Sequence, residues 1–271
     1  MEIVVALVGA LGVIIAALVT RGITQKQNQL EINGIEKAVR DVGKADSGRI
    51  KFVAPYYIQR VERYDKISCD GDEIDTYRYI GVKAYQSFDN LRIPFIVGVE
   101  GPDAVFHEPT VKELPGSSLT VTLDKVEKFT IPNLNQSYIK GFIVINGHFS
   151  PETNPVSFER IVNCDRIYCM TKEEAVETYQ HSDWKQEYSI VEANVPTDEL
   201  VLTIEFPECM KEMNPGPSPL VFIGDSEIVH QGETKRIISK FQFKDRIAQL
   251  QVESPILGLR YAITWMPPSN N

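Results

Sequence analysis

An apolar run at the start of the chain constrains the fold more than any other feature of the sequence. Residues Ile3–Thr20 contain no charged side chain, and Thr20 is their only polar residue. A helix of this length, rising about 1.5 Å per residue, extends roughly 27 Å, which is close to the hydrocarbon thickness of a bilayer. Because a helix satisfies its own backbone hydrogen bonds in lipid, we predict a transmembrane helix over residues 1–20, with residues 3–20 in the bilayer.

The flanks of this run predict that it is a retained single-pass anchor. A signal peptide has a basic start and a small-residue cleavage site, whereas this chain begins Met1-Glu2 and has no A-x-A pattern before Arg21. Basic residues follow the run at Arg21 and Lys26, and none precedes it. The positive-inside tendency therefore predicts that the C-terminal body lies in the cytoplasm.

Small residues lie four positions apart within the anchor. The pairs are Ala6/Ala10 and Gly12/Ala16. Such spacing lets two membrane helices approach closely, which predicts that the anchor self-associates through these residues. The alternative is that they reflect the ordinary abundance of Ala and Gly in membrane helices.

A polar stalk with charges of both signs follows over residues 21–49. Asn33 and Glu36 match an N-cap and its reciprocal acid, and Gly43 matches a C-terminal stop, so we expect a short helix over 34–42. Packing on the body is the favoured role of this helix. Self-association is the alternative, although two turns are too short for an independent coiled coil.

From residue 50 onward the pattern indicates a mainly β body. Short apolar runs alternate with Pro, Gly, Asn and Asp, and Leu200, Leu202 and Ile204 share one face of a period-two pattern. The pattern predicts an antiparallel β-sandwich, with a barrel as the alternative. The expected strands cover residues 50–58, 77–86, 92–100, 118–123, 138–145, 156–163, 200–206, 237–243, 248–252 and 259–265.

One helix interrupts this pattern. Thr171 and Glu174 form a T-x-x-E capping box, which predicts a helix over 172–181. We therefore expect a first β-rich domain at 50–170, a connecting helix at 171–184 and a C-terminal antiparallel sandwich-like domain at 185–268. A single β body is the alternative.

Composition excludes one class of partner. The 271 residues carry a net charge of −9, and nucleic-acid binding requires cations that neutralise phosphates, so no nucleic-acid partner is expected. The four cysteines, Cys69, Cys164, Cys169 and Cys209, are too few for a disulfide framework. Reduced thiols are favoured, and a single disulfide is the alternative.

Motifs for catalysis and metal binding are missing from the sequence. It contains no H-E-x-x-H, G-x-S-x-G or phosphate-binding glycine loop. The acidic run Asp70–Asp75 does not follow the calcium-loop register, which favours a solvated turn. We therefore predict a protein that is not an enzyme and binds neither a cofactor nor a metal.

Two groups of residues are candidates for ligand or partner contact. Tyr77, Tyr79 and Tyr85 cluster in the first β region, where a stacking pocket is the alternative to ordinary core packing. Met210 and Met213 lie in the proline-rich stretch 207–219, which predicts an exposed loop with an adaptable apolar contact. A plain connecting loop is the alternative.

The layout of an N-terminal membrane helix, a polar stalk and a β-rich body resembles membrane-anchored effector or accessory proteins of bacterial conflict (anti-phage) systems. The C-terminal run Pro255–Trp265 (PILGLRYAITW) is similar to the closing strand of β-rich modules in such systems. The resemblance implies a cytosolic body that senses a signal or binds a partner, while the anchors assemble in the membrane.

Three functions remain as hypotheses. The first is a non-enzymatic single-pass membrane protein whose β-rich body binds a protein partner or small ligand and acts through anchor oligomerisation. The second is a membrane-tethered enzyme with a site of dispersed acids and histidines, such as Asp70, Asp72, His107 and His148. The third is a structural or assembly subunit of a membrane complex.

Overall fold

The computed structural model describes residues 54–100, 104–117, 119–131, 136–179, 186–223, 227–228 and 237–269. They belong to one compact unit that spans Ile50–Asn271. The predicted transmembrane helix (1–20), with Ala6, Ala10, Gly12 and Ala16, and the predicted stalk (21–49) lie outside the described residues. Within the described part of the chain, no helix is long and apolar enough to cross a membrane.

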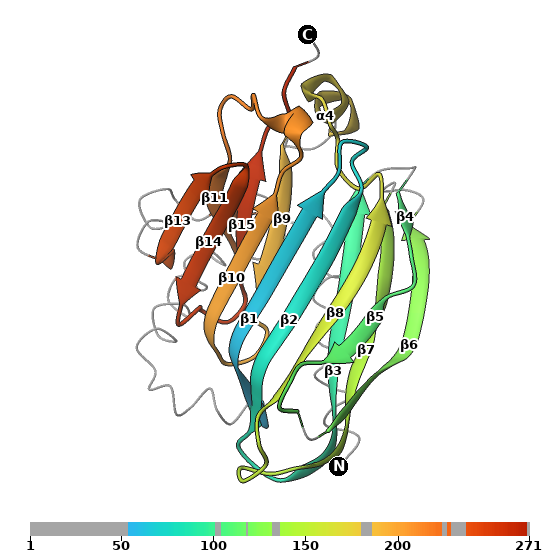
Figure 1. Ribbon diagram of the computed structural model, residues 1–271, viewed down its shortest axis with the longest axis vertical. Helices are drawn as coiled ribbons and strands as arrows, with labels where there is room; N and C mark the ends of the chain where they lie inside the picture. The colour runs from blue at the N-terminus through green and yellow to red at the C-terminus, as the bar shows by residue number, and fades with distance from the viewer. Residues whose placement is uncertain are drawn as a thin grey trace, which may run out of the picture. The chain divides into compact units, whose positions relative to one another are not determined.

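The unit is built on one large sheet of eight strands (Figure 1). Seven strands follow one another across this sheet, and β5 (Thr110–Glu113) pairs with β8 beside them. In spatial order the seven are β13 (Lys240–Lys244), β14 (Ile247–Glu253), β10 (Thr197–Glu205), β1 (Tyr56–Ile67), β2 (Glu73–Ala84), β8 (Val156–Asp165) and β4 (Val105–Phe106).

Two smaller sheets complete the β structure. One has three strands in the order β3 (Phe88–Glu100), β7 (Gln136–Phe149) and β6 (Thr120–Ile131). The other has four in the order β12 (Glu227–Ile228), β11 (Ser218–Ile223), β15 (Leu259–Trp265) and β9 (Glu187–Glu192).

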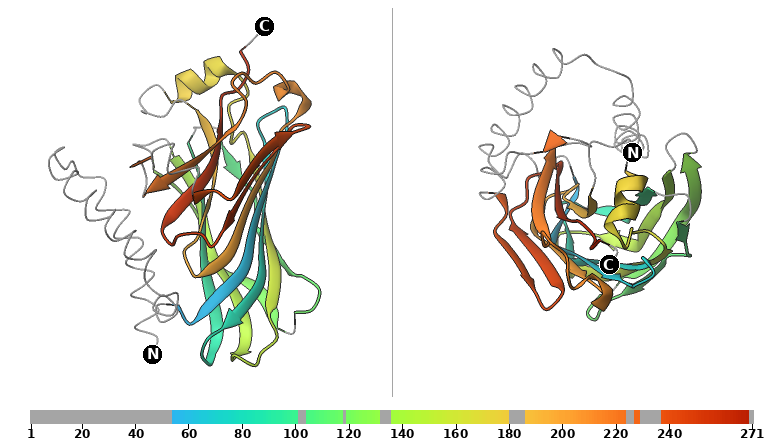
Figure 2. Two further views of the ribbon diagram at one scale, coloured as in Figure 1. Left: turned by 90° about the vertical axis from the view of Figure 1, so that its left-hand side faces the viewer. Right: turned by 90° about the horizontal axis from the view of Figure 1, so that it is seen from above.

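Both smaller sheets cover the same face of the large sheet (Figure 2). Register places Arg63 of β1 and Arg160 of β8 on one face, because both are paired with Tyr77 of β2. Arg63 donates a hydrogen bond to the carbonyl of Ile190 in β9, and Arg160 stacks on Phe95 of β3. We call this covered side the inner face and the opposite side the outer face.

The hydrophobic core lies between the large sheet and the two smaller ones. The predicted period-two alternation is confirmed in β10, where Leu200, Leu202 and Ile204 are fully buried. From the smaller sheets, Ile143 of β7 and Tyr261 of β15 are equally buried and belong to the same core. Alternation of this kind results from burying one side of each strand.

The predicted antiparallel arrangement is wrong at the centre of the large sheet. β1 pairs with β10 in parallel, with Val61 opposite Leu200 and Asp65 opposite Ile204. The large sheet is therefore mixed. Alternation reveals which residues are buried but carries no information about strand direction, so the sequence pattern did not indicate this pair.

The same pair corrects the predicted division into two β domains. β1 belongs to the expected domain at 50–170 and β10 to the expected domain at 185–268, yet they are neighbours in one sheet. One core contains buried residues from both sides of the helix. The segment 171–184 therefore does not separate two cores, and the fold is a layered arrangement of three sheets.

The predicted interrupting helix is confirmed as α4 (Lys172–Thr178). The hydroxyl of Thr171 accepts the backbone N–H of Glu174 at 3.2 Å, and the Glu174 carboxylate accepts the backbone N–H of Thr171 at 3.1 Å. This is the capping box that the sequence predicted. The helix ends at Thr178, three residues before the predicted end.

A disulfide joins Cys69 to Cys209, with Cα atoms 6.0 Å apart. Cys69 lies in the turn between β1 and β2, and Cys209 lies in a short 3-10 helix, η2 (Glu208–Met210), which follows β10. The prediction of reduced thiols is wrong for this pair, and the single-disulfide alternative describes it. The partners are 140 residues apart, so no local spacing indicated the bond.

If the body has one core, a mutation at the β1–β10 seam should destabilise all of it. Leu202→Ala removes a fully buried side chain from β10 and should lower the free energy of unfolding by about 2–5 kcal/mol. Denaturant unfolding of the full chain in detergent, followed by tyrosine and tryptophan fluorescence, should show one transition that shifts as a whole.

The matched control is Val176→Ala on α4, where the side chain is 42% exposed. A surface change of this kind should stay within about 0.5 kcal/mol of the unmodified chain. Two transitions, of which Leu202→Ala moved only one, would restore the two-domain interpretation.

Candidate functional site

Five charged side chains lie together on the inner face of the large sheet, and we call them the buried charge cluster. They are Arg63, Asp65, Glu73, Asp75 and Arg160. The side chains of the three acids are at most 1% exposed, that of Arg160 is 3% exposed and that of Arg63 is 13% exposed. Charged groups are almost never buried to this degree unless they are paired.

Strand register explains why these groups meet. Asp65 of β1 is directly opposite Asp75 of β2, and Arg63 is opposite Tyr77. Facing carboxylates repel each other across a strand pair. Arg63 bridges them, with its Nε 2.8 Å from Asp65 Oδ1 and 3.5 Å from Asp75 Oδ1.

The second guanidinium, that of Arg160 in β8, binds one of the same carboxylates. Arg160 Nη2 donates to Asp75 Oδ2 at 2.6 Å. Its planar head lies between two aromatic rings, 4.8 Å from the centroid of Tyr77 and 5.1 Å from that of Phe95. This stacking helps to hold the cation at a buried position, because the face of an aromatic ring attracts positive charge.

The cluster also connects the large sheet to segments that pack on its inner face. Arg63 donates to the carbonyl of Ile190 at 2.7 Å, and the hydroxyl of Ser189 donates to Asp65. The hydroxyl of Tyr168, in the loop before α4, donates to Glu73 at 2.8 Å. The cluster therefore joins the large sheet to β9 and to the chain that leads into α4.

Three carboxyl groups face two guanidinium groups, so the cluster is one positive charge short of neutrality. Burial raises the pKa of Glu73 well above its usual range, and the negative charge of Asp65 raises it further. Burial also raises the pKa of Asp65. The pKa of Arg63, which burial by itself would lower, is raised on balance by the three carboxylates. Glu73 is therefore the carboxyl group on which a proton that neutralises the cluster would be held.

The hydrogen bonding of the cluster is incomplete. Glu73 Oε2, Asp75 Oδ1 and Arg160 Nε are buried and have no hydrogen-bond partner in the structure. Asp75 Oδ1 makes only the 3.5 Å ion pair with Arg63. Buried groups that lack hydrogen bonds cost stability, and the cost is larger for a charged group than for a neutral one.

The outer face of the same strands carries a row of ion pairs across five strands, which we call the ion-pair ladder. It consists of Lys112, Glu159, Arg78, Glu62, Arg60 and Glu199 in spatial order. The successive N–O distances are 2.7, 3.0, 3.7, 2.8 and 3.4 Å. Burial alone would raise the pKa of Glu159, but hydrogen bonds from Lys112 and Arg78 lower it on balance.

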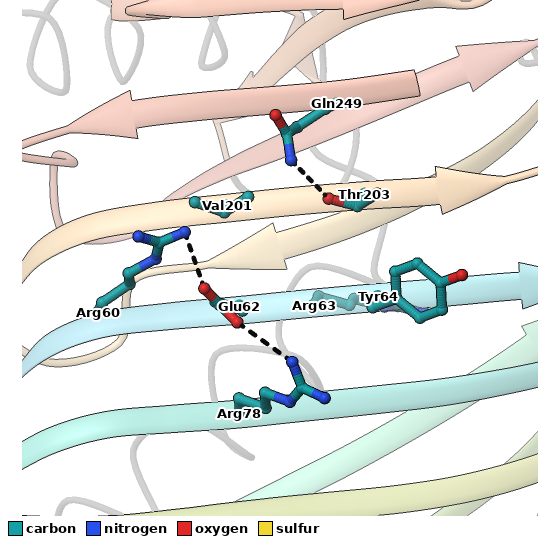
Figure 3. A pocket seen from close by; sticks show the side chains of 8 residues that line it. All are labelled: Arg60, Glu62, Arg63, Tyr64, Arg78, Val201, Thr203 and Gln249. Atoms are coloured by element: carbon teal, nitrogen blue, oxygen red, sulfur yellow. Dashed lines mark hydrogen bonds and ion pairs between the residues drawn. The ribbon is translucent and has the colours of Figure 1, made fainter. Parts of the chain in front are cut away.

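An open pocket of about 340 Å³ lies beside this ladder (Figure 3). Its lining comes from β1, β2, β10 and β14, and consists of Arg60, Glu62, Arg63, Tyr64, Arg78, Val201, Thr203 and Gln249. In Figure 3, Arg60 and Arg78 both reach toward Glu62, and the Gln249 amide reaches toward Thr203. The amide donates to the Thr203 hydroxyl at 3.2 Å.

The charges of the ion-pair ladder on the outer face are balanced. The ladder contains three cations and three carboxylates that neutralise one another. It therefore presents alternating charges and no surplus of positive charge for a polyanion.

The structure brings two of the candidate tyrosines together, since the ring centroids of Tyr77 and Tyr79 are 5.7 Å apart, and Tyr85 stacks on Tyr57 instead. Tyr79 is buried on the inner face and stacks on Phe158 at 4.8 Å, whereas Tyr77 lies beside the guanidiniums of the buried charge cluster. Tyr85 follows β2 and stacks on Tyr57 at 4.8 Å. Tyr79 therefore belongs to the hydrophobic core, and Tyr77 is partly buried against it.

The two candidate methionines are part of the core region. Met210 is fully buried, and Met213 is partly buried against the core. The prediction of an exposed methionine contact is wrong for Met210, because η2 turns its side chain inward.

The dispersed acids and histidines form separate pairs. His107 lies 2.8 Å from Asp165, and His148 lies 2.8 Å from Asp89 on a different sheet. Asp72 accepts the backbone N–H of Arg166. Among the described residues, no group of three or more His, Cys, Asp or Glu side chains is arranged to hold a metal ion.

Sequence reasoning missed the buried charge cluster because it treated Asp70–Asp75 as a solvated turn. That interpretation is wrong for Glu73 and Asp75, which are buried in β2. A signal was present, since Glu73, Asp75, Tyr77 and Tyr79 occupy alternate positions of one strand. The two acids lie where the pattern would place apolar residues.

Comparisons with known proteins give only distant similarity. No protein-family model matches the chain, and no curated protein matches it at a significant level. Among solved structures, native leukotriene A4 hydrolase from Saccharomyces cerevisiae is similar over 78% of this chain and 29% of its own, with 10% identity and a TM-score of 0.36.

Two bacterial structures show similarity of the same order. An M1 zinc metallopeptidase from Deinococcus radiodurans matches 77% of this chain and 42% of its own, with 6% identity and a TM-score of 0.31. A putative protease from Parabacteroides distasonis matches 78% and 40%, with 8% identity and a TM-score of 0.33. The chain therefore spans less than half the length of these three proteins, and similarity at this level carries no information about activity.

The raised pKa of Glu73 predicts a specific pH dependence of stability. Because the folded pKa exceeds the unfolded value of about 4.3, the folded state binds the proton more tightly. Stability from this group is complete below pH 4.3 and is lost as pH rises through the folded pKa. Glu73→Gln keeps a neutral side chain of the same shape and should remove this loss.

The measurement is the free energy of unfolding of both chains between pH 5 and pH 8. The advantage of Glu73→Gln over the unmodified chain should grow by up to about 1.4 kcal/mol per pH unit below the folded pKa. Glu212→Gln, at an exposed position, is the control and should show no such growth. An advantage that does not change with pH would contradict the assignment of the proton to Glu73.

Proposed function

We propose that this chain is a non-enzymatic, single-pass membrane protein whose β-rich body binds a protein partner. In this proposal, residues 3–20 anchor the protein in the bilayer, and binding is transmitted through association of the anchors. The contact surface is the outer face of the large sheet, around the pocket beside the ion-pair ladder.

The observation that carries this proposal is the unequal covering of the large sheet. Both smaller sheets lie on the inner face, as the contacts of Arg63 and Arg160 show. The outer face carries the pocket, and its ladder cations Arg60 and Arg78 have side chains that are 41% and 48% exposed. In the part of the chain that the structure describes, the pocket lies on a face that neither smaller sheet covers, so a partner can reach it. Of the buried charge cluster, Arg63 also lines the pocket, whereas the three acids are at most 1% exposed.

The chemistry of this face supports a protein as the partner. Its cations are paired with carboxylates within the ladder, so a nucleic acid would gain little from binding them. Protein surfaces offer both charges and amide groups, and Thr203, Gln249 and Tyr64 present hydroxyl and amide groups in the same pocket. Alternating charge fixes the orientation and register of a partner more than it adds affinity.

Site-directed photocrosslinking would test this contact. A photoreactive residue at Gln249 of the full chain, in membranes of the native host, should give one discrete crosslinked product. Thr203→Trp fills the pocket with a residue that strands accommodate well and should reduce the product by at least about tenfold, which corresponds to about 1.4 kcal/mol of binding.

The matched control is Ile96→Trp on β3, where the side chain is 61% exposed on another sheet. This variant should leave the crosslinked product unchanged. A product that Thr203→Trp leaves intact, or that a probe at Ile96 captures equally, would exclude the outer face as the contact surface.

The role of the anchor is tested by replacing a small residue at its predicted packing face. Gly12→Ile adds a branched side chain where two helices would approach closely. In native membranes, chemical crosslinking of the unmodified chain should give oligomers, and Gly12→Ile should reduce them several-fold. Leu11→Ile, which adds no bulk beside it, is the control. A strictly monomeric chain, unaffected by either change, would exclude assembly through the anchor.

A further inference from the structure

The Cys69–Cys209 disulfide joins two segments that are each held in place by their own backbone hydrogen bonds. Cys69 is in a tight turn, in which the Ser68 N–H donates to the Asp72 carbonyl and the Gly71 N–H donates to the Ser68 carbonyl. Cys209 is held next to the fully buried Met210, whose N–H donates to the Pro207 carbonyl. The turn between β1 and β2 and the short helix after β10 lie at the same end of the large sheet (Figure 1).

The four cysteines divide according to exposure. Cys69 and Cys209 are exposed and bonded to each other. Cys164 is buried in β8, and burial raises the pKa of its thiol well above the usual range. Burial, together with the negative charge of Glu187, raises the pKa of Cys169 to about 12. The exposed thiols are therefore paired, and the unpaired ones are held in the unreactive protonated form.

The surroundings of the bond are those of a structural disulfide. Its sequence neighbours Asp70 and Glu208 are acidic, and Glu208 already pairs with Lys211 at 3.7 Å and with Arg246 at 3.3 Å. Cysteines that cycle between redox states lie beside cations that stabilise a thiolate, whereas these two cations are engaged by a carboxylate. An exposed disulfide does not persist in a reducing cytoplasm, where glutathione and thioredoxin keep thiols reduced.

We infer that the β-rich body folds and works in an oxidising compartment, with Cys69 and Cys209 joined as a structural disulfide. A thiol–disulfide oxidase of that compartment supplies the oxidant. The thiolate of Cys209 attacks the oxidase disulfide and releases one oxidase thiol. The Cys69 thiolate then attacks the mixed disulfide and releases the second. Two chain thiols are oxidised to one disulfide, and one oxidase disulfide is reduced to two thiols.

This inference reverses the orientation that the basic flank predicted. Arg21 and Lys26 favour a cytoplasmic body, but two basic residues are a weak bias, and the chemistry of the body opposes it. With a single anchor at residues 3–20, Met1 would face the cytoplasm and the body would face outward. The inference of an oxidising compartment does not depend on the proposed partner. It uses the proposed anchor only to predict that the protein is found in the membrane fraction.

Thiol counting on the full chain in native membranes tests the bond. Free thiols are blocked with N-ethylmaleimide under denaturing conditions, and the protein is then reduced and labelled with a maleimide polymer. The unmodified chain and Cys169→Ala should each gain two labels. Cys69→Ala and the double variant Cys69→Ala/Cys209→Ala should gain none. Loss of the bond should also lower the Tm by roughly 5–15 °C.

Reporter fusions after Asn271 test the compartment in the same cells. Alkaline phosphatase, which requires its own disulfides, should be active, and a cytoplasmic fluorescent protein at this position should be dim. Two labels with an active phosphatase support the inference. If N-ethylmaleimide blocks all four cysteines, so that no polymer label is gained after reduction, the inference is overturned. An inactive phosphatase fusion together with a bright fluorescent fusion also overturns it. Active phosphatase found in the soluble fraction and not in the membrane fraction would exclude the anchor but not the oxidising compartment. The partner crosslink at Gln249 is a separate test, and its outcome does not depend on these results.

Discussion

The ion pairs of Arg63 are the interaction on which the centre of this structure depends. One guanidinium binds Asp65 on its own strand and Glu73 and Asp75 on the next, and it also reaches the backbone of β9. Without this cation, two facing aspartates would repel each other in the middle of the large sheet. Removing one partner of a buried ion pair leaves an uncompensated charge, which costs more than the pair contributes when intact. The cluster therefore specifies how the layers fit together more than it adds net stability.

The same two strands place opposite chemistry on the two faces of the sheet. Since successive side chains of a strand point to opposite faces, Arg63 of β1 enters the buried cluster while Arg60 and Glu62 enter the exposed ladder. The inner cations stabilise a fixed arrangement in a buried layer, where charges interact strongly. The outer cations lie in a screened environment, where each pair contributes about 0–1 kcal/mol. The outer pairs are therefore free to exchange their partners on binding, and the inner ones are not.

The sequence predicted local structure well and long-range structure poorly, and the residues show why. The capping box of Thr171 and Glu174 is a contact between residues three apart, so its pattern was complete in the sequence, and the helix is confirmed. The mainly β class followed from alternation in strands such as β10. The parallel β1–β10 pair and the disulfide join residues more than a hundred positions apart and leave no local pattern. The predicted strand at 50–58 was displaced from β1 (Tyr56–Ile67), because charged residues interrupt the apolar pattern of β1 and one of them, Asp65, occupies a buried position.

The positions of the charged side chains explain how the net charge of −9 affects binding. In the cluster, two cations are buried against three carboxyls, and in the ladder the cations are already paired, so neither group offers free positive charge to an anion. The acidic surplus is carried by exposed side chains such as Asp70 and Glu212. An acidic, charge-paired body is repelled by anionic lipid headgroups. Under the proposed function, attachment to a bilayer therefore depends on the apolar run at residues 3–20 and not on the charged surface of the body.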